Sequence, residues 1–205
     1  MTSGKMHLQI APADRGILKL LLGKTVILGV TGSIAAWQTP EIAGQLRSLW
    51  CNVQCIMTKS ATEFLAPLTL QSASKNPVFV SMYDSSKNFY AGHSALAEIA
   101  DLLLVAPATA NIIGKMANGI ADDLLSSTVL AAKSPVVIAP AMNPNMYSNN
   151  VTQLNMRKLE AAGFHFVYPE YGPTTCGTEG VGRLARIPSI IKKVTNLLER
   201  LEQTE

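Results

Sequence analysis

The sequence predicts a doubly wound α/β fold, with a single Rossmann-like parallel sheet and helices on both faces. Short, wholly apolar segments alternate with helical segments, as expected for buried parallel strands joined by right-handed crossovers. Glycine-rich or polar residues directly follow these apolar segments, and 205 residues suit one domain with a full core. We expect residues 1–20, which show no regular period, to be an N-terminal extension and residues 21–205 to form one domain.

The first half of the chain contains two predicted strands. Residues 25–30 are apolar, as in the centre of a parallel sheet, and residues 51–57 form the second strand. Between them, the turn at 31–33 leads into a helix whose apolar side chains are Ile34, Ile42, Leu46 and Leu49. Residues 66–92 are polar and irregular, and we expect a mobile surface region there.

The second half repeats the alternation. Apolar strands are predicted at 102–106 and 136–139, separated by helical sequence at 110–132. A helix at 150–162 has a start signal at Asn149-Asn150 and a stop at Gly163. A loop at 171–182, rich in Gly, Pro and Thr, precedes a last helix at about 188–202.

Composition excludes several classes of protein. Charged residues make up 15% of the chain and hydrophobic ones 48%, with a mean hydropathy of +0.21, which favours an oligomer that buries a helical surface. The net charge of +3 and the scattered basic residues argue against nucleic-acid binding. The longest apolar run, 17–30, is broken by Lys19, Gly23 and Lys24, so we expect no membrane span.

The cysteines and the N-terminus indicate a cytoplasmic protein. Three cysteines do not make a disulfide framework, and no basic segment followed by an apolar one marks a secretion signal. Cys51 and Cys55 have no His or Cys pair nearby for zinc, so both are interpreted as core residues and no metal site is expected. His7 and His165 are interpreted as structural or exposed.

A glycine turn follows the first strand. Gly32 permits close approach of a ligand to the backbone, and the helix that begins there offers free N–H groups to a phosphate. Ser33 either donates to that ligand or simply caps the helix. The turn lacks the three glycines of the dinucleotide fingerprint, and no acidic residue ends the second strand, which favours one phosphate over a pyrophosphate.

Hydroxyl and amide side chains follow the next two strands. Thr58 and Ser60, with Lys59 between them, suit a phosphate or a ribityl chain, and a helix cap at Ser60 with Glu63 in the first turn is an equal alternative. The small residues at 107–110 leave room for a flat ring, and the side chains of Thr109 and Asn111 can meet its polar edge. The alternative is a Pro-stopped strand with Thr109 as N-cap.

The run at 140–147, Pro-Ala-Met-Asn-Pro-Asn-Met-Tyr, follows the strand at 136–139. Loops beyond the carboxyl ends of parallel strands form the ligand crevice of such folds. Asn143 carries amide donors and an acceptor that need partners when buried, although Asn and Pro are also common in ordinary turns.

These motifs together resemble the homo-oligomeric flavin-containing cysteine decarboxylase family. The resemblance covers about residues 24–195 and is carried by 32–36, His93 with Leu96 and Ala97, 107–111, 140–147, Cys176-Gly177 and Gly182-Arg183. Two departures are Tyr147, where the family usually has Trp, and Leu184, where many members have Met. Both keep a large apolar side chain.

The resemblance implies FMN as cofactor. The family's FMN-binding positions are matched here by Gly32, Ser33, Ile34, Thr58, Ser60, Thr109, Ala110, Asn111 and Met142. The positions that bind substrate are matched by Asn111, Asn143, Met146 and Arg183. In relatives the flavin lies between the subunits of a trimer, which implies a homotrimer here, or a dodecamer built of trimers.

The implied chemistry is decarboxylation of a cysteinyl substrate after flavin oxidises its thiol. His93 matches the family's base, and Asn111 and Asn143 can bind the substrate carboxylate or amide by hydrogen bonds. Cys176 matches the proton donor of phosphopantothenoylcysteine decarboxylases, so the expected substrate is 4′-phosphopantothenoylcysteine of coenzyme A biosynthesis. The alternatives are oxidative decarboxylation of a C-terminal peptide cysteine to an enethiol and a flavin-binding regulatory protein.

Overall fold

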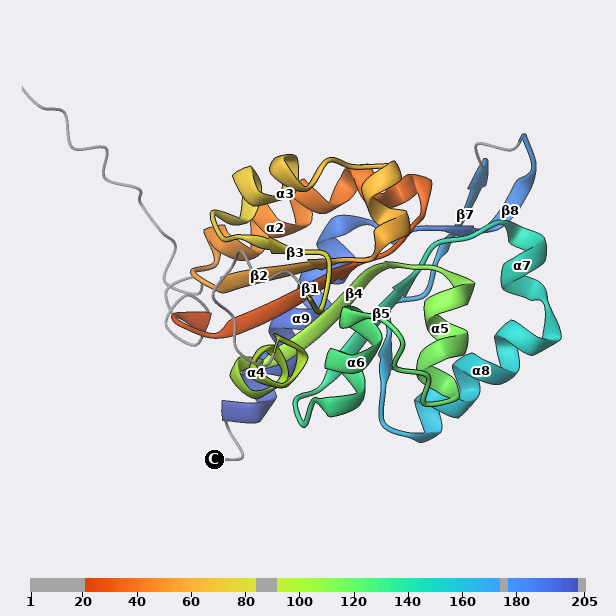
Figure 1. The fold of residues 1–205 in the computed structure, drawn as a ribbon. Helices are drawn as coiled ribbons and strands as arrows, with labels where there is room; N and C mark the ends of the chain where they lie inside the picture. Colours follow the sequence, from red (N-terminus) through yellow and green to blue (C-terminus); the bar gives the residue numbers. More distant parts are fainter. Residues whose placement is uncertain (1–20, 84–91, 174–176, 203–205) are drawn as a thin grey trace, which may run out of the picture.

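The computed structural model describes residues 21–83, 92–173 and 177–202, and it contains the predicted parallel sheet (Figure 1). Six strands pair in the order β3-β2-β1-β4-β5-β6, and every pairing is parallel. The strands are β1 (Thr25–Val30), β2 (Asn52–Met57), β3 (Val78–Phe79), β4 (Leu102–Ala108), β5 (Val136–Pro140) and β6 (His165–Phe166). The doubly wound fold is confirmed.

Helices cover both faces of the sheet and enclose two hydrophobic cores. One core lies against α2 (Thr39–Ser48), α3 (Pro67–Ser74) and α9 (Ile187–Glu202). The other lies against α4 (Gly92–Ile99), α5 (Ala110–Ala117), α6 (Leu124–Ala131) and α8 (Asn150–Ala161) (Figure 1). Because successive strand residues point to opposite faces, Leu28 enters the first core and Ile27 the second. Each is fully buried, which contributes about 1.5–3 kcal/mol per side chain.

Residues 67–79 are ordered, so the predicted irregular surface region is wrong there. Pro67 opens α3, and Lys75 ends it in the left-handed conformation with φ 60°. The side-chain amide of Asn76 then donates to Val53 O over 2.8 Å, which leads the chain into β3. Residues 84–91 of that predicted region lie outside the described residues.

The predicted helix 110–132 is two helices. Helix α5 ends at Ala117, and Gly119 with φ 67° redirects the chain. Asp123 then starts α6 through a capping box, in which its carboxylate accepts from Ser126 N over 2.8 Å and its own N–H donates to Ser126 Oγ over 3.1 Å.

The predicted loop 171–182 contains an antiparallel hairpin. Its strands are β7 (Glu170–Pro173) and β8 (Glu179–Arg183), and Figure 1 shows them standing away from the main sheet beside α7 (Pro144–Ser148). Gly and Pro are depleted in strands, and both occur in this pair of strands, so the sequence did not indicate the hairpin.

Several helix boundaries agree with those predicted from the sequence. Asn149 caps α8 and Gly163 follows its end with φ 89°, as predicted, and α9 begins one residue before the predicted start. The first predicted helix instead begins as a 3-10 turn, η1 (Ile34–Gln38), before α2. Ile34, the first of the apolar side chains named for that helix, is 53% exposed.

Cys51 and Cys55 are core residues, as predicted. Both side chains pack in the first core, where burial raises the pKa of Cys51 to about 11 and that of Cys55 to about 12. Both therefore stay protonated and unreactive near neutral pH. Over the described ranges, no helix is both long and apolar enough to cross a bilayer.

Candidate functional site

Four strands end at one edge of the sheet in residues that cap the following helices. Ser33 caps η1, Thr58 caps η2 (Lys59–Glu63), Thr109 caps α5 and Asn143 caps α7. The capped N–H groups and their distances to the side-chain oxygens are Ala35 N at 3.3 Å, Ala61 N at 3.3 Å, Ile112 N at 3.4 Å and Asn145 N at 2.9 Å. Helix N-termini therefore converge on one region, which favours an anionic ligand. The cap of η2 is Thr58, so the alternative of a cap at Ser60 is wrong.

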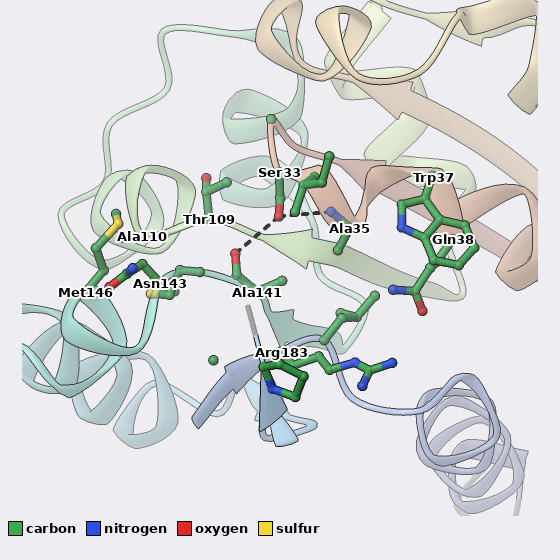
Figure 2. Close-up of a pocket in the computed structure, with 16 residues that line it drawn as sticks. Ser33, Ala35, Trp37, Gln38, Thr109, Ala110, Ala141, Asn143, Met146 and Arg183 are labelled. Atoms are coloured by element: carbon green, nitrogen blue, oxygen red, sulfur yellow. Dashed lines mark hydrogen bonds between the residues drawn. The ribbon is translucent and has the colours of Figure 1, made fainter. Parts of the chain in front are cut away.

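A cavity of about 390 Å³, hereafter the first cavity, opens between these strand ends and the hairpin. In Figure 2, Trp37 and Gln38 stand on one side of it, and Ala110, Asn143 and Met146 stand on the other. The lining residues are Gly32, Ser33, Ile34, Ala35, Trp37, Gln38, Thr109, Ala110, Ala141, Met142, Asn143, Met146, Pro173, Gly182, Arg183 and Leu184. Pockets of this size, mostly apolar with a few placed polar groups, are typical of cofactor and small-molecule sites.

The hairpin forms one wall of the first cavity because it rests directly on the loop after β5. Met142 N donates to Gly182 O over 2.9 Å, and a Cβ built on Gly180 would lie 2.7 Å from Pro144 Cβ. A Cβ on Gly182 would overlap the carbonyl oxygen of Met142. Only glycine permits this close approach.

The first cavity brings together most of the predicted site residues. They are Gly32, Ser33, Ile34, Thr109, Ala110, Met142, Asn143, Met146 and Arg183. Ser33 Oγ also donates to Ala141 O over 3.4 Å, which ties the turn after β1 to the loop after β5 (Figure 2). Their assigned roles stay predictions.

Thr58, Ser60 and Asn111 line a second cavity of about 210 Å³, which shares Thr109 with the first. The hydroxyl oxygens of Thr58 and Ser60 lie 3.1 Å apart. Ser60 also packs against Gly32, since a Cβ there would lie 2.6 Å from Ser60 Cβ. The two cavities therefore adjoin, and the predicted hydroxyl cluster lies beside the glycine turn.

Lys115 and Asp123 also line the second cavity, as do Thr31, Lys59 and Ile112. Lys115 Nζ lies 2.7 Å from Asp122 Oδ1 and 2.8 Å from Asp123 Oδ2. Burial opposes the charge on Lys115, but these bonds outweigh it and raise the pKa of that ammonium. Burial also opposes the charge on Asp123, yet Lys115 and the N–H of Ser126 lower the pKa of that carboxyl. The ammonium charge is thus already balanced by two carboxylates.

Two predicted catalytic residues are not brought to the first cavity by the described chain. His93 lies in the first turn of α4, half-buried, and is not among the residues that line either cavity. Helix α4 packs on α6, below the sheet in Figure 1. Cys176 lies outside the described residues, between β7 and β8 in the sequence. Among the described residues, no group of His, Cys, Asp or Glu could hold a metal ion.

Sequence reasoning missed Ala35, Trp37, Gln38, Ala141 and Pro173 as wall residues. Trp37 is 64% exposed although it follows an apolar helix start. A tryptophan and a glutamine in the short helix after the glycine turn were the available signal, because a helix that begins at a ligand crevice presents its first turn to the ligand.

Comparison with protein families gives one match of nearly full length. A family model described as Flavoprotein matches residues 18–199. The coenzyme A biosynthesis bifunctional protein CoaBC of Vibrio vulnificus (strain YJ016) is 42% identical over 167 residues, which are 82% of this chain and 42% of that protein. The chain thus spans less than half the length of this curated relative.

Solved structures share the fold. A PPC decarboxylase mutant complexed with pantothenoylaminoethenethiol has a TM-score of 0.78 and 29% identity, over 86% of this chain and 99% of that one. The FMN-dependent cysteine decarboxylase SpaF has a TM-score of 0.75 and 31% identity, over 88% of this chain and 98% of that one.

Proposed function

Because the chain belongs to the flavoprotein family, we propose that it is an FMN-dependent decarboxylase of a cysteinyl substrate, 4′-phosphopantothenoylcysteine in coenzyme A biosynthesis. The observation that carries the proposal is the first cavity, which Asn143 and Met142 line together with residues at the capped helix starts after β1 and β4. The similarity to a PPC decarboxylase and to CoaBC supports the choice of substrate. The reaction concerns this chain, which matches only part of the bifunctional relative.

The residues of the two adjoining cavities fit FMN. Ala35, Ala110 and Ala141 give the first cavity small walls that leave room for a flat ring system. The hydroxyls of Thr58 and Ser60, with the N–H groups after Gly32, suit a ribityl chain and a single phosphate. When bound, FMN would accept a hydride from the cysteine thiol carbon and leave the substrate carboxylate β to a C=S group that takes up its electrons.

The chain's own polar groups bind the substrate and move protons. Asn143 uses its Oδ1 to cap α7, so its Nδ2–H₂ group is available to donate to the substrate carboxylate. Arg183, which also lines the first cavity, supplies further donors to an anionic substrate. Cys176 is proposed to protonate the enethiolate as the hydride returns, so that only CO₂ is lost overall.

The base, His93, reaches the substrate from a neighbouring copy in a homotrimer. Two observations support this: His93 does not line the first cavity of its own chain, and the apolar side chains of Ile34 and Trp37 at that cavity are 53% and 64% exposed. Apolar side chains left exposed beside a site are typical of an interface. Trimers can assemble further into a dodecamer, and the cytoplasm is the proposed location.

Subunit mixing tests the shared site. His93→Asn and Asn143→Asp chains, each inactive alone, are mixed under conditions that exchange subunits. Random mixing in trimers should restore about a quarter of the sites, because a cavity from one variant then meets a His93 from the other. If His93 acts within its own chain, no activity returns.

Product analysis tests the reaction itself. The purified protein should release FMN, not FAD, on denaturation, and convert 4′-phosphopantothenoylcysteine to the saturated thiol. Oxidative decarboxylation of a peptide C-terminal cysteine is the second candidate, favoured by the similarity to SpaF. That reaction would give an enethiol lighter by two hydrogens from a peptide. A colourless protein that ignores added FMN would refute both candidates.

A further inference from the structure

A third cavity, of about 420 Å³, continues from the first. Gln38, Arg183 and Leu184 line both cavities, so they form the junction between them. Beyond the junction the walls come from the starts of α2 and α9 and from β7, and the remaining lining residues are Glu41, Glu170, Arg186, Ile187 and Pro188. Nothing in the proposed decarboxylation uses this space.

Arg183 projects into the junction with its donors uncommitted. Figure 2 shows its guanidinium extending to the side of the first cavity where Gln38 stands. Within the part of the chain that the structure describes, it makes no hydrogen bond or ion pair. An unpaired guanidinium between two cavities is a donor group for a ligand that passes from one to the other.

Arg186 is held in place and still has donors to offer. Its Nε lies 3.1 Å from Glu170 Oε1 and 3.2 Å from Glu170 Oε2, so the carboxylate occupies that one nitrogen. Across the described residues, the two terminal nitrogens have no partner. Glu41, the other carboxylate that lines the third cavity, accepts a hydrogen bond from Gln45 over 3.1 Å. A planar fork of free donors suits a tetrahedral anion.

We propose that the third cavity receives the end of the substrate remote from its cysteine, and that Arg186, positioned by Glu170, recognises a phosphate monoester there together with Arg183. The inference rests on the proposed function. Glu170 pairs with Arg186, and Glu41 brings a second carboxylate to the wall of the cavity, so selectivity comes from the hydrogen-bonding fork more than from net charge. A phosphate brings three acceptor oxygens to that fork.

The test compares two substrates that differ only in the phosphate. We expect FMN-loaded enzyme to have a higher kcat/KM for phosphopantothenoylcysteine than for pantothenoylcysteine. Arg186→Gln should lower the ratio of the two values about tenfold, the low end for hydrogen bonds to a charged group because the side chain is largely exposed. Arg186→Lys keeps the charge without the fork and should lower the ratio partway. Glu170→Gln, which frees Arg186, should do likewise.

The matched control is Arg157→Gln, which removes the same charge from an exposed position on α8 that lines none of the three cavities. Calorimetric binding of phosphopantetheine and pantetheine gives the same ratio without turnover. If the enzyme turns over both substrates and Arg186→Gln does not lower the ratio of their kcat/KM values, this inference alone is overturned. Turnover of neither would refute the proposed function and the inference with it.

Discussion

Replacing Gly182 by alanine should detach the hairpin from the wall of the first cavity. The new Cβ would overlap the carbonyl oxygen of Met142 and lie 3.3 Å from Pro144 N and 3.4 Å from Asn143 C. All three are backbone atoms, which cannot rotate away as a side chain can. Either the loop after β5 or β8 must shift, and the bond from Met142 N to Gly182 O, now 2.9 Å, is lost.

The cost follows from these two effects. One main-chain hydrogen bond contributes about 1 kcal/mol, and overpacking costs about 1–3 kcal/mol. The loss cannot exceed the free energy that docks the hairpin, because the hairpin can separate while the main sheet stays folded. We therefore expect a loss of about 2 kcal/mol, or roughly 5 °C in Tm for a chain of this size. Decarboxylation should fall much further, since the hairpin carries Arg183 beside the cavity.

Gly172→Ala is the matched control in the same hairpin. A Cβ there would meet Arg183 Cδ at 3.6 Å, an ordinary contact, so stability and activity should change little. The assays are thermal unfolding of the FMN-loaded protein at fixed concentration and kcat/KM for decarboxylation. Equal behaviour of the two variants in both assays would refute the argument that close approach at Gly182 fixes the hairpin.

Three further predictions follow from the assigned roles. His93→Asn should retain bound FMN by absorbance and lose CO₂ release by about a hundredfold or more, the contribution of a general base, and decarboxylation at the wild-type rate would contradict the assignment. Cys176→Ser should release the enethiol, lighter by two hydrogens in mass spectra, because a hydroxyl is too weak an acid to replace the thiol; a saturated product from this variant would contradict it. Asp123 has a lowered pKa, so its contribution to stability is present above the unfolded value of about 3.9 and is lost as pH falls below it. Asp123→Asn should therefore flatten the fall in urea-measured stability between about pH 5 and pH 2, and an unchanged pH slope would count against it.

The sheet could be predicted from the sequence because each central strand is marked by its own run of apolar residues. Residues 26–30 and 102–106 are buried on both faces, so they are apolar without a break, and the polar cavity residues closely follow them. The hairpin could not be predicted in this way, because β7 and β8 are held by each other and by the loop at Met142. Their exposed, glycine-rich residues carry no hydrophobic period.

The separation of α5 from α6 at Gly119 is a different case, because the sequence did contain a helix stop and start there. Asn118-Gly119 followed by Asp123 is a stop and start sequence inside an apolar helical pattern, and the period of that pattern obscured it. The location of His93 had no local signal at all. Its distance from the first cavity depends on how α4 packs against α6, and only the family resemblance pointed to that residue.

Because Cys51 and Cys55 are buried, thiol reagents should label the protein at a single cysteine. With pKa values of about 11 and 12, roughly a thousandth of these thiols or less is ionised at pH 8, and neither is accessible to a reagent. A maleimide or iodoacetamide that modifies the native protein will therefore modify Cys176. Counting labels per chain then reports on a single position. If Cys176 contacts the substrate as proposed, protection of that position by substrate measures occupancy without any engineered cysteine.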